Sequence, residues 1–236
     1  MRTNVPGGLV VVALDANGRR LTEAPLGHGE HPDVVLGAAG WIIESPVSTG
    51  LRDDGTLEVA YRVRRLDGIR PRLERVPRDD GVGEHEVGEP FQRVAAYAVV
   101  TSVRGVLLTQ FSSQTHVVGD WGLPGGGLDD GESPVDGVHR EVWEETGQRI
   151  ELGDLLAVQS QHWVGRAPSG VLEDFHAVRI VYGATCPEPT EVVIHDVGGT
   201  TSDARWVPVE QVPDYRLSSS WRHLAALHAL VPPSEA

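Results

Sequence analysis

The sequence predicts an α/β protein in two parts, a small α+β module over residues 1–78 and a larger domain over residues 91–236. In the larger part, strand patterns are mixed with two helix patterns, which indicates a sheet covered by helices on both faces. Between the parts, residues 79–90 (DDGVGEHEVGEP) are acidic and glycine-rich and show no apolar periodicity. We therefore interpret residues 79–90 as a linker.

The first module is expected to contain three strands and one helix. Residues 8–14 predict a strand, the Asn17-Gly18 pair predicts a turn into a short partner strand, and residues 56–66 alternate as a strand does. A short helix is expected over residues 31–39, ending at Gly40. No family resemblance is identified for this module, so its role stays open between dimerisation, a lid and contact with a partner molecule.

The larger domain is expected to begin with paired strands and to contain a helix over residues 134–146. Pro134 suits the first position of that helix, Ser133 is a candidate cap and Gly147 a natural terminator. An amphipathic helix is expected at residues 221–231, with Ser220 as its cap. The expected strands cover residues 93–101, 106–111, 155–164, 171–183 and 204–208.

Composition narrows the possible functions. Hydrophobic residues make up 40% of the 236 residues and charged residues 23%, as in ordinary globular proteins. No apolar run approaches the ~20 residues of a membrane span, and the first residues lack the features of a signal peptide. The single cysteine, Cys186, excludes an internal disulfide and cysteine-based zinc clusters. A cytoplasmic protein with no membrane partner is expected.

The net charge of −14 argues against binding to nucleic acid. A polyanionic substrate such as a nucleotide would therefore need bound cations. Against this background, residues 62–78 hold seven arginines. A solvated strand edge is the default interpretation of these arginines, and a site for substrate phosphates or for the acidic face of a partner is the alternative.

Three carboxylates share one face of the helix expected at residues 134–146. At ~100° per residue, Glu144 and Glu145 fall within about 60° of Glu141. Such a group repels itself unless a cation lies between its members, and Mg²⁺ or Mn²⁺ prefers oxygen ligands of this kind. Val138 and Val142 lie on another face and are expected to pack against the sheet. Arg140 is placed to pair with Glu144 at i,i+4.

These residues belong to a longer pattern that resembles the Nudix box, G-x5-E-x7-R-E-U-x-E-E-x-G-U, in which U is a bulky apolar residue. Seven fixed positions match in register, for which chance gives a probability on the order of 10⁻⁸ per starting point. The preceding WGLPGGG also resembles the lead-in of that family. One position departs, because Gln148 stands where the box has an apolar residue, and Ile150 is expected to supply the missing packing contact. The matching residues are Gly126, Glu132, Arg140, Glu141, Val142, Glu144, Glu145 and Gly147.

The resemblance covers residues 91–232 and implies an α/β/α sandwich with a mixed sheet. It implies a hydrolase that cleaves a diphosphate bond in a nucleoside diphosphate linked to another group, with Mg²⁺ or Mn²⁺ as cofactor. Glu141, Glu144, Glu145 and the carbonyl of Gly125 would bind metal. Glu132 would support these ligands, and Arg140 would orient them.

The substrate is less well defined. ADP-ribose hydrolases of this family carry a proline about 15 residues after the box, where this chain has Trp163, and the tyrosine of dinucleoside-polyphosphate hydrolases is missing from residues 148–180. By elimination the chain resembles MutT-like nucleoside-triphosphate hydrolases. The alternatives are an ADP-ribose or nucleotide-sugar pyrophosphatase and a non-catalytic nucleotide-sensing module, and a homodimer is possible.

Several other residues are weaker candidates. Glu173, Asp174, Glu191 and Asp196 are possible general bases, although most are expected to be ordinary loop acids. Residues 160–163 (SQHW) and 174–176 (DFH) could stack on a nucleotide base, but packing is the more ordinary role. The ten histidines show no zinc-binding spacing and are assigned no metal.

Overall fold

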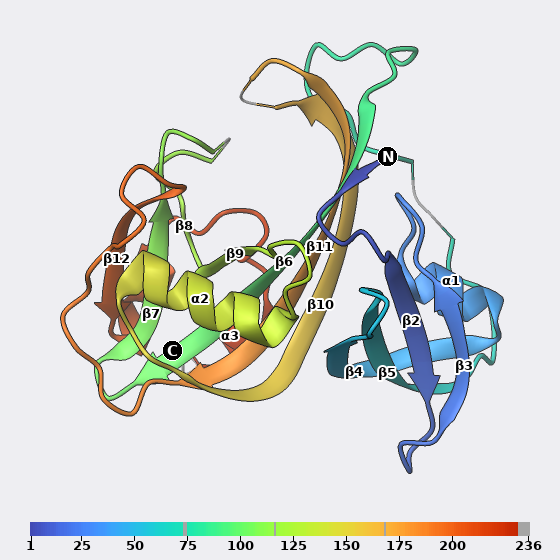
Figure 1. Ribbon diagram of the computed structural model, residues 1–236, viewed down its shortest axis with the longest axis horizontal. Helices are drawn as coiled ribbons and strands as arrows, with labels where there is room; N and C mark the ends of the chain where they lie inside the picture. Colours follow the sequence, from blue (N-terminus) through green and yellow to red (C-terminus); the bar gives the residue numbers. More distant parts are fainter. Residues whose placement is uncertain (73–74, 116, 168, 231–236) are drawn as a thin grey trace, which may run out of the picture. The chain divides into compact units, whose positions relative to one another are not determined.

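The computed structural model describes residues 1–72, 75–115, 117–167 and 169–230 (Figure 1). The chain divides into two compact units. Unit 1 consists of residues 1–96, 127–134 and 155–180, and unit 2 consists of residues 97–126, 135–154 and 181–236. Among the described residues, no helix is both long and apolar enough to cross a membrane.

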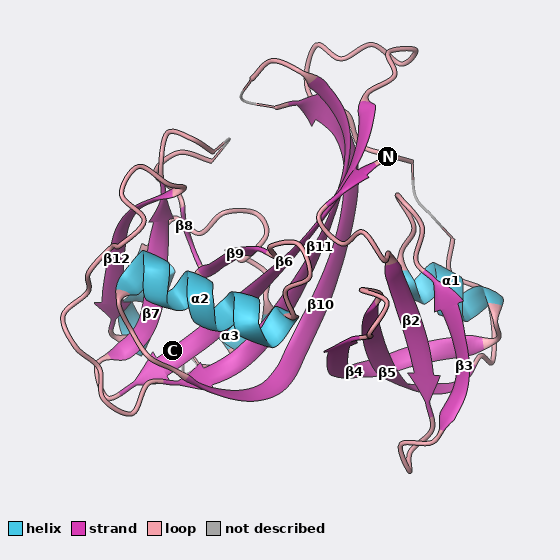
Figure 2. Ribbon diagram, in the orientation of Figure 1, coloured by secondary structure: helices cyan, strands magenta, loops and turns pink. Residues whose placement is uncertain are grey.

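Unit 1 contains a four-stranded sheet in the order β3-β2-β5-β4 (Figure 2). Strand β2 pairs in parallel with β5 and antiparallel with β3, across the predicted turn at Asn17-Gly18. The inward side chains, such as Val11 and Leu57, are fully buried, as is Leu36 of the helix. The elements are β2 (Leu9–Leu14), β3 (Arg20–Pro25), α1 (Pro32–Ala38), β4 (Trp41–Leu51) and β5 (Leu57–Arg65).

The predictions for this sheet are confirmed except at β4, which the sequence did not predict. Pro46 and Gly50 interrupt its alternation, and its register against β5 shifts twice, between Ile43 and Ser45 and between Pro46 and Ser48. Strand β4 lies at the edge of the sheet, where a proline and an irregular register are tolerated. An irregular edge strand leaves little periodicity in the sequence.

The second sheet follows the order β10-β11-β6-β7-β12, with β1 and β9 paired to β6 and β8 paired to β7. It is mixed, because β1 is parallel to β6 whereas β7 is antiparallel to it. Every residue of β6 from Val94 to Val100 is buried, as a strand covered on both faces requires. Four of these strands, β6, β9, β10 and β11, contribute residues to both units. The strands are β1 (Arg2–Thr3), β6 (Glu89–Ser102), β7 (Gly105–Phe111), β8 (Trp121–Gly122), β9 (Gly125–Gly127), β10 (Glu151–Arg166), β11 (Leu172–Thr185) and β12 (Thr201–Val207).

Helix α2 (Pro134–Thr146) lies across the sheet in Figure 1 and has the predicted bounds. Val138 and Val142 are fully buried, which confirms the face predicted to pack on the sheet. At its end Gly147 adopts φ +70°, and its N–H donates to the carbonyl of Trp143. A residue other than glycine would be strained in this left-handed conformation.

The helix predicted at residues 221–231 is shorter than expected. A 3₁₀ helix (Val209–Asp214) comes first, and α3 spans only Ala225–His228, with Leu224 rather than Ser220 at its start. The N–H groups of Trp221 and Leu224 donate to carbonyls three residues back, so this stretch forms turns. The apolar pattern nevertheless predicted the burial of Trp221, Leu224 and Leu227, but not the exposure of His228, and Trp221 packs edge-on against Tyr97 with ring centroids 4.6 Å apart. Val231 lies outside the described residues.

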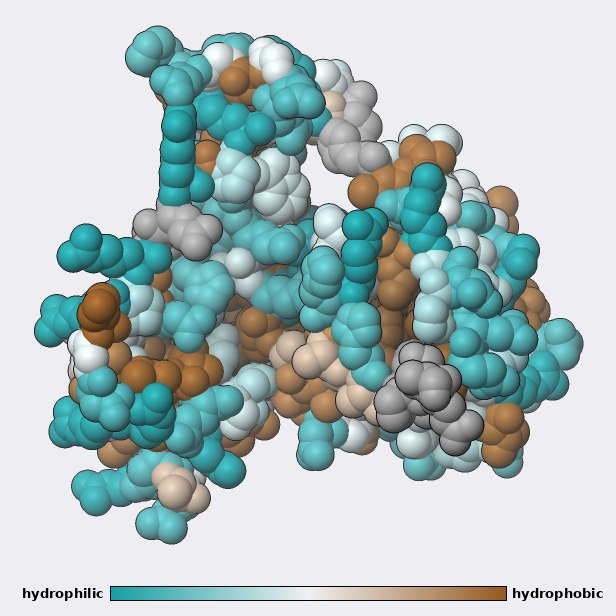
Figure 3. Space-filling model, turned by 180° about the vertical axis from the view of Figure 1, so that it is seen from behind, coloured by the Kyte–Doolittle hydropathy of each residue, from teal (hydrophilic) through white to brown (hydrophobic). Residues whose placement is uncertain are grey.

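Hydrophilic residues predominate over the face drawn in Figure 3, with smaller hydrophobic areas among them.

Candidate active site

Helix α2 carries the three glutamates of the predicted metal face in unit 2. Glu145 is 4% exposed, whereas the side chains of Glu141 and Glu144 are 17% and 36% exposed. The helix therefore holds one carboxylate inside the protein and two nearer to solvent. Ions of one sign are costly to keep so close unless a cation joins them.

Two neutral donors hold the buried carboxylate of Glu145. The N–H of Gly125 donates to Oε2 at 2.9 Å, and the hydroxyl of Thr201 donates to Oε1. Burial raises the pKa of Glu145 from 4.5 to about 8, and the negative charges of Glu141 and Asp196 add to this rise. The hydrogen bonds from Thr201 and Gly125 oppose it in part. Without a cation, Glu145 is mostly protonated at neutral pH.

Arg140 joins the other two glutamates. Its Nη1 lies 3.0 Å from Oε1 of Glu141 and 3.0 Å from Oε2 of Glu144. The predicted i,i+4 pair is thus present, and the same nitrogen also reaches Glu141. Because these side chains are only partly exposed, the guanidinium fixes both carboxylates in one orientation.

The glycine-rich segment before helix α2 leaves room for the carboxylate of Glu141. A Cβ at Gly126 would lie 2.5 Å from Oε1 of Glu141, so any side chain there would displace the carboxylate. Gly125, whose φ is +138°, presents its N–H to Glu145. The sequence signal for Gly126 thus has a steric cause, while the metal-binding role predicted for the Gly125 carbonyl stays a prediction.

A loop before β12 covers the C-terminal end of helix α2, and most of its contacts join residues far apart in the sequence. The N–H groups of His195 and Asp196 both donate to the carbonyl of Glu144, at 2.7 and 3.1 Å. The rings of His195 and Trp143 stack with centroids 4.1 Å apart. Thr201 lies 56 residues from Glu145 and outside every motif. No sequence pattern pointed to it.

Of the four candidate bases, Asp196 is the one whose charge acts on Glu145. Glu191 belongs to the same unit, but its side chain is 90% exposed and pairs with Arg104. Glu173 pairs with Arg2, and Asp174 contacts two histidines, all within unit 1. Asp196 is therefore the strongest of these candidates.

Glu132 lies in unit 1, apart in the chain from the helix glutamates. Its Oε2 accepts a hydrogen bond of 2.9 Å from the N–H of Asp129, whose carbonyl in turn accepts from the N–H of Glu132. The carboxylate thus closes the turn before helix α2. Its supporting role toward a metal stays a prediction.

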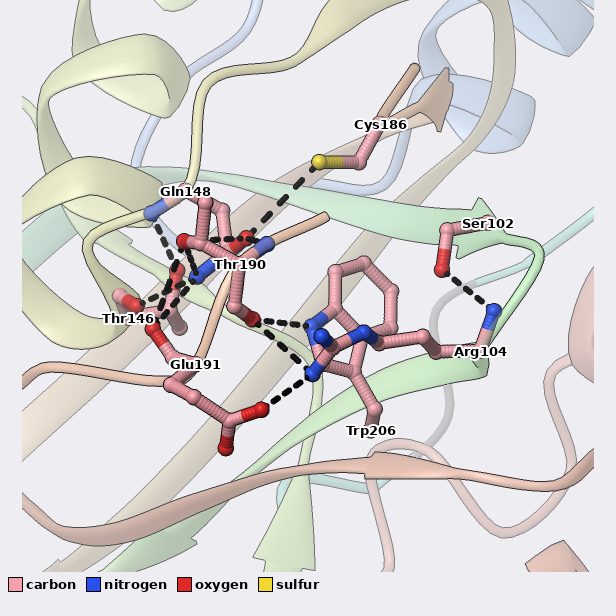
Figure 4. Close-up of polar contacts among 8 residues, drawn as sticks. All are labelled: Ser102, Arg104, Thr146, Gln148, Cys186, Thr190, Glu191 and Trp206. Atoms are coloured by element: carbon pink, nitrogen blue, oxygen red, sulfur yellow. Dashed lines mark hydrogen bonds and ion pairs between the residues drawn. The ribbon is translucent and has the colours of Figure 1, made fainter. Parts of the chain in front are cut away.

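Gln148, the irregular position of the box, is structural. It is 2% exposed, and its Nε2 donates to the carbonyls of Thr146 and Glu191 and to Thr190 Oγ1, while its Oε1 accepts from the N–H of Thr190 (Figure 4). The amide therefore ties the end of helix α2 to the segment after β11. Ile150 is buried, in agreement with its predicted packing role.

The aromatic and arginine-rich candidates lie in unit 1. His176 is fully buried and Trp163 packs on Phe175 with centroids 4.7 Å apart, which supports the packing interpretation of these segments. Several arginines pair locally, as Arg64 does with Asp67 at 2.7 Å and Arg75 does with Glu84. These pairs fit a solvated edge.

The residues present fit a hard divalent cation. Glu141, Glu144 and Glu145 offer carboxylate oxygens, the ligands that Mg²⁺ prefers, from one helix, and Gly126 has no Cβ to collide with the carboxylate of Glu141. Burial makes the ionised form of Glu145 unfavourable, so the carboxylate holds a proton when no cation is present. A bound divalent cation would stabilise the ionised carboxylate in place of that proton.

Comparisons with known proteins identify the family. Residues 91–227 match the NUDIX domain. The chain belongs to this family. It is 44% identical over 69 residues to a MutT-like protein of Streptomyces ambofaciens, which covers 29% of this chain and 43% of that protein. It is 28% identical over 115 residues to the nucleoside triphosphatase NudI of Salmonella schwarzengrund, covering 48% of this chain and 79% of the relative.

Among solved structures, the MutT protein of Methanosarcina mazei Go1 aligns with a TM-score of 0.46 and 23% identity, over 61% of this chain and 96% of that one. The match of residues 91–227 to the NUDIX domain confirms the predicted family, and the parallel and antiparallel partners of β6 confirm the predicted mixed sheet. The Streptomyces alignment spans less than half of its relative's length.

Proposed function

We propose that this chain is a metal-dependent hydrolase that cleaves a diphosphate bond, with a nucleoside triphosphate as substrate and Mg²⁺ (or Mn²⁺) as cofactor. The supporting observation is the carboxylate cluster on helix α2, in which Arg140 holds Glu141 and Glu144 while Gly125 and Thr201 hold Glu145. Glu141, Glu144, Glu145 and the Gly125 carbonyl would hold the ion, with Glu132 in support.

A bound divalent cation supplies charge neutralisation on the phosphate oxygens and a water of lowered pKa. The residues of this chain position the reaction. Arg140 keeps two carboxylates oriented, and Gly126 keeps the approach to Glu141 open. Asp196 is the proposed acceptor of the proton from the attacking water, so that hydroxide attacks phosphorus as the phosphoanhydride bond breaks.

The preference for a nucleoside triphosphate rests on the missing ADP-ribose and dinucleotide signatures and on similarity to a nucleoside triphosphatase. Residues 91–236 are proposed to form the hydrolase domain, residues 79–90 a linker and residues 1–78 an added module. A cytoplasmic location and a homodimer also belong to the proposal. Light scattering of the full chain measures its oligomeric state.

The test is a substrate panel with product identification. The purified protein is incubated with nucleoside triphosphates, ADP-ribose and nucleotide sugars in Mg²⁺ or Mn²⁺, and products are identified by phosphorus NMR. Release of pyrophosphate or phosphate from triphosphates, abolished by EDTA, supports the proposal. Faster cleavage of ADP-ribose or a nucleotide sugar would replace the substrate assignment. Tight nucleotide binding with no turnover under any metal would indicate a sensing module instead.

A further inference from the structure

Unit 1 contains a second cluster of metal-ligating side chains that lies outside the Nudix box. His28 follows β3, His162 lies on β10 and Asp174 lies on β11. One ligating atom from each falls within 4.8 Å of the other two. His28 Nε2 lies 3.2 Å from Oδ1 of Asp174, and Nε2 of His162 contacts the same oxygen.

The histidine of this cluster that comes from the first module is incompletely bonded. Both ring nitrogens of His28 are closed off from solvent, and neither has a hydrogen-bond partner among the described residues. Its Nε2 is near Asp174, but the contact lacks hydrogen-bond geometry. Buried polar atoms are nearly always paired, and an ion bound at Nε2 would give that nitrogen a partner.

The surroundings hold both rings in place. The rings of His28 and His162 meet edge to face with centroids 5.1 Å apart. A Cβ at Gly29, whose φ is +73°, would lie 2.7 Å from the ring of His162, so only glycine allows the loop to come this close. His176 lies beside them but is already bonded, with Nδ1 accepting from the N–H of Gly29 and Nε2 contacting Ser160. His176 therefore supports the loop and does not offer a free nitrogen.

A cavity of about 830 Å³ adjoins the cluster within unit 1. His28 and His162 line it, together with Arg72 and Arg75 on another part of its wall. A metal held by the three side chains would thus face a space large enough for water or a small anion. The side chains of the three ligands are 16–26% exposed, so the ion would be sheltered and still accessible.

We propose that His28, His162 and Asp174 form a site for a divalent transition-metal ion, Zn²⁺ in the first instance, whose fourth position opens on the cavity. Two imidazoles and one carboxylate are characteristic ligands of zinc sites that keep a position open, whereas Mg²⁺ takes oxygen ligands. This site is separate in composition from the glutamates of helix α2. No spacing rule found it, because the two histidines lie 134 residues apart and come together only through the fold.

The test uses the full chain, freed of metal by chelation and titrated with Zn²⁺ by calorimetry. Removing a direct ligand should weaken binding at least as much as removing an outer partner does, about 100-fold. His162→Ala and Asp174→Asn should therefore lose the tight site. His223→Gln, at an exposed histidine in unit 2, should keep it. Glu145→Gln should keep it too, which separates this site from the box and its hydrolase function.

X-ray absorption of the wild-type protein with one equivalent of Zn²⁺ gives a readout that does not depend on variants. Imidazole scattering from two nitrogen ligands is expected, whereas binding at the glutamates would show oxygen ligands alone. Oxygen-only coordination, no tight binding by the wild type, or equal affinity in Asp174→Asn would overturn the proposal. In those cases the cluster is an internal ion pair of Asp174 with two histidines.

Discussion

The substitution Glu145→Gln should change how stability depends on pH when no metal is present. Glu145 has a pKa of about 8 in the folded protein against an ordinary value of 4.5, chiefly because it is buried. The folded state therefore binds more protons than the unfolded state between these values. The stability that the protonated carboxyl contributes is fully present below pH 4.5 and is lost as pH rises toward 8.

The size of this effect follows from the pKa difference. Each pH unit in that window costs the wild type up to about 1.4 kcal/mol, and between pH 5 and pH 8 the total is roughly 3 kcal/mol. Glutamine stays neutral throughout and can still accept the N–H of Gly125, so it escapes this loss. The variant should gain roughly 3 kcal/mol relative to wild type over this range.

Urea unfolding in EDTA at several pH values measures the free energy of unfolding of both proteins. Subtracting one from the other cancels the titrations of the other groups. In saturating Mg²⁺ the slope should diminish, because the cation takes the place of the proton on the wild-type carboxylate. A difference between the two proteins that stays flat from pH 5 to pH 8 would show that Glu145 ionises normally. The burial argument would then be wrong.

Three further substitutions test the geometry around helix α2. Gly126→Ala should lower kcat/KM on the order of 100-fold, because its Cβ would displace the Glu141 carboxylate, whereas Gly50→Ala, which meets no neighbour, should leave kcat/KM unchanged. Gln148→Leu restores the apolar residue of the Nudix box yet should cost about 1 kcal/mol in urea unfolding, since the N–H of Thr190 and the carbonyl of Glu191 lose their hydrogen bonds to the amide. Thr201→Val removes a hydrogen-bond donor that lowers the pKa of Glu145. At fixed Mg²⁺ the rising limb of the pH–rate profile should therefore move to higher pH. Thr201→Ser keeps the hydroxyl and should give the wild-type profile.

Each of these three predictions has a result that would contradict it. Equal kcat/KM in Gly126→Ala would mean that Glu141 has another position available in the working enzyme. A Gln148→Leu protein as stable as wild type would show that its amide network contributes no net stability. If the pH–rate profile of Thr201→Val does not shift, the group whose titration limits the rate is not Glu145.

The sequence predicted the bounds and the local contacts of the helix that carries the box, because those interactions are local. The bounds of helix α2, its buried valines and the Arg140–Glu144 pair all follow from 3.6-residue periodicity and from a proline and a glycine at its ends. The helix expected over residues 221–231 was wrong in its length, because an apolar spacing reports burial and does not by itself fix the backbone conformation. Its apolar spacing reflected burial of Trp221, but the backbone there forms turns.

Long-range contacts could not be predicted in this way. Thr201 meets Glu145 and His28 meets Asp174 only because the strands bring them together. Strand β4 was missed because an edge strand with Pro46 and two register shifts carries no clean alternation. Local periodicity identifies elements, but their pairing is set by tertiary packing that a single sequence does not display.

The most direct test of the account compares turnover of a nucleoside triphosphate by the wild-type protein and Glu145→Gln in saturating Mg²⁺. We expect metal-dependent release of phosphate or pyrophosphate by the wild type and a loss on the order of 100-fold or more in the variant, since the substitution removes a proposed ligand to the ion. Undiminished turnover in Glu145→Gln would contradict the assignment of the helix α2 carboxylates as the metal-binding centre.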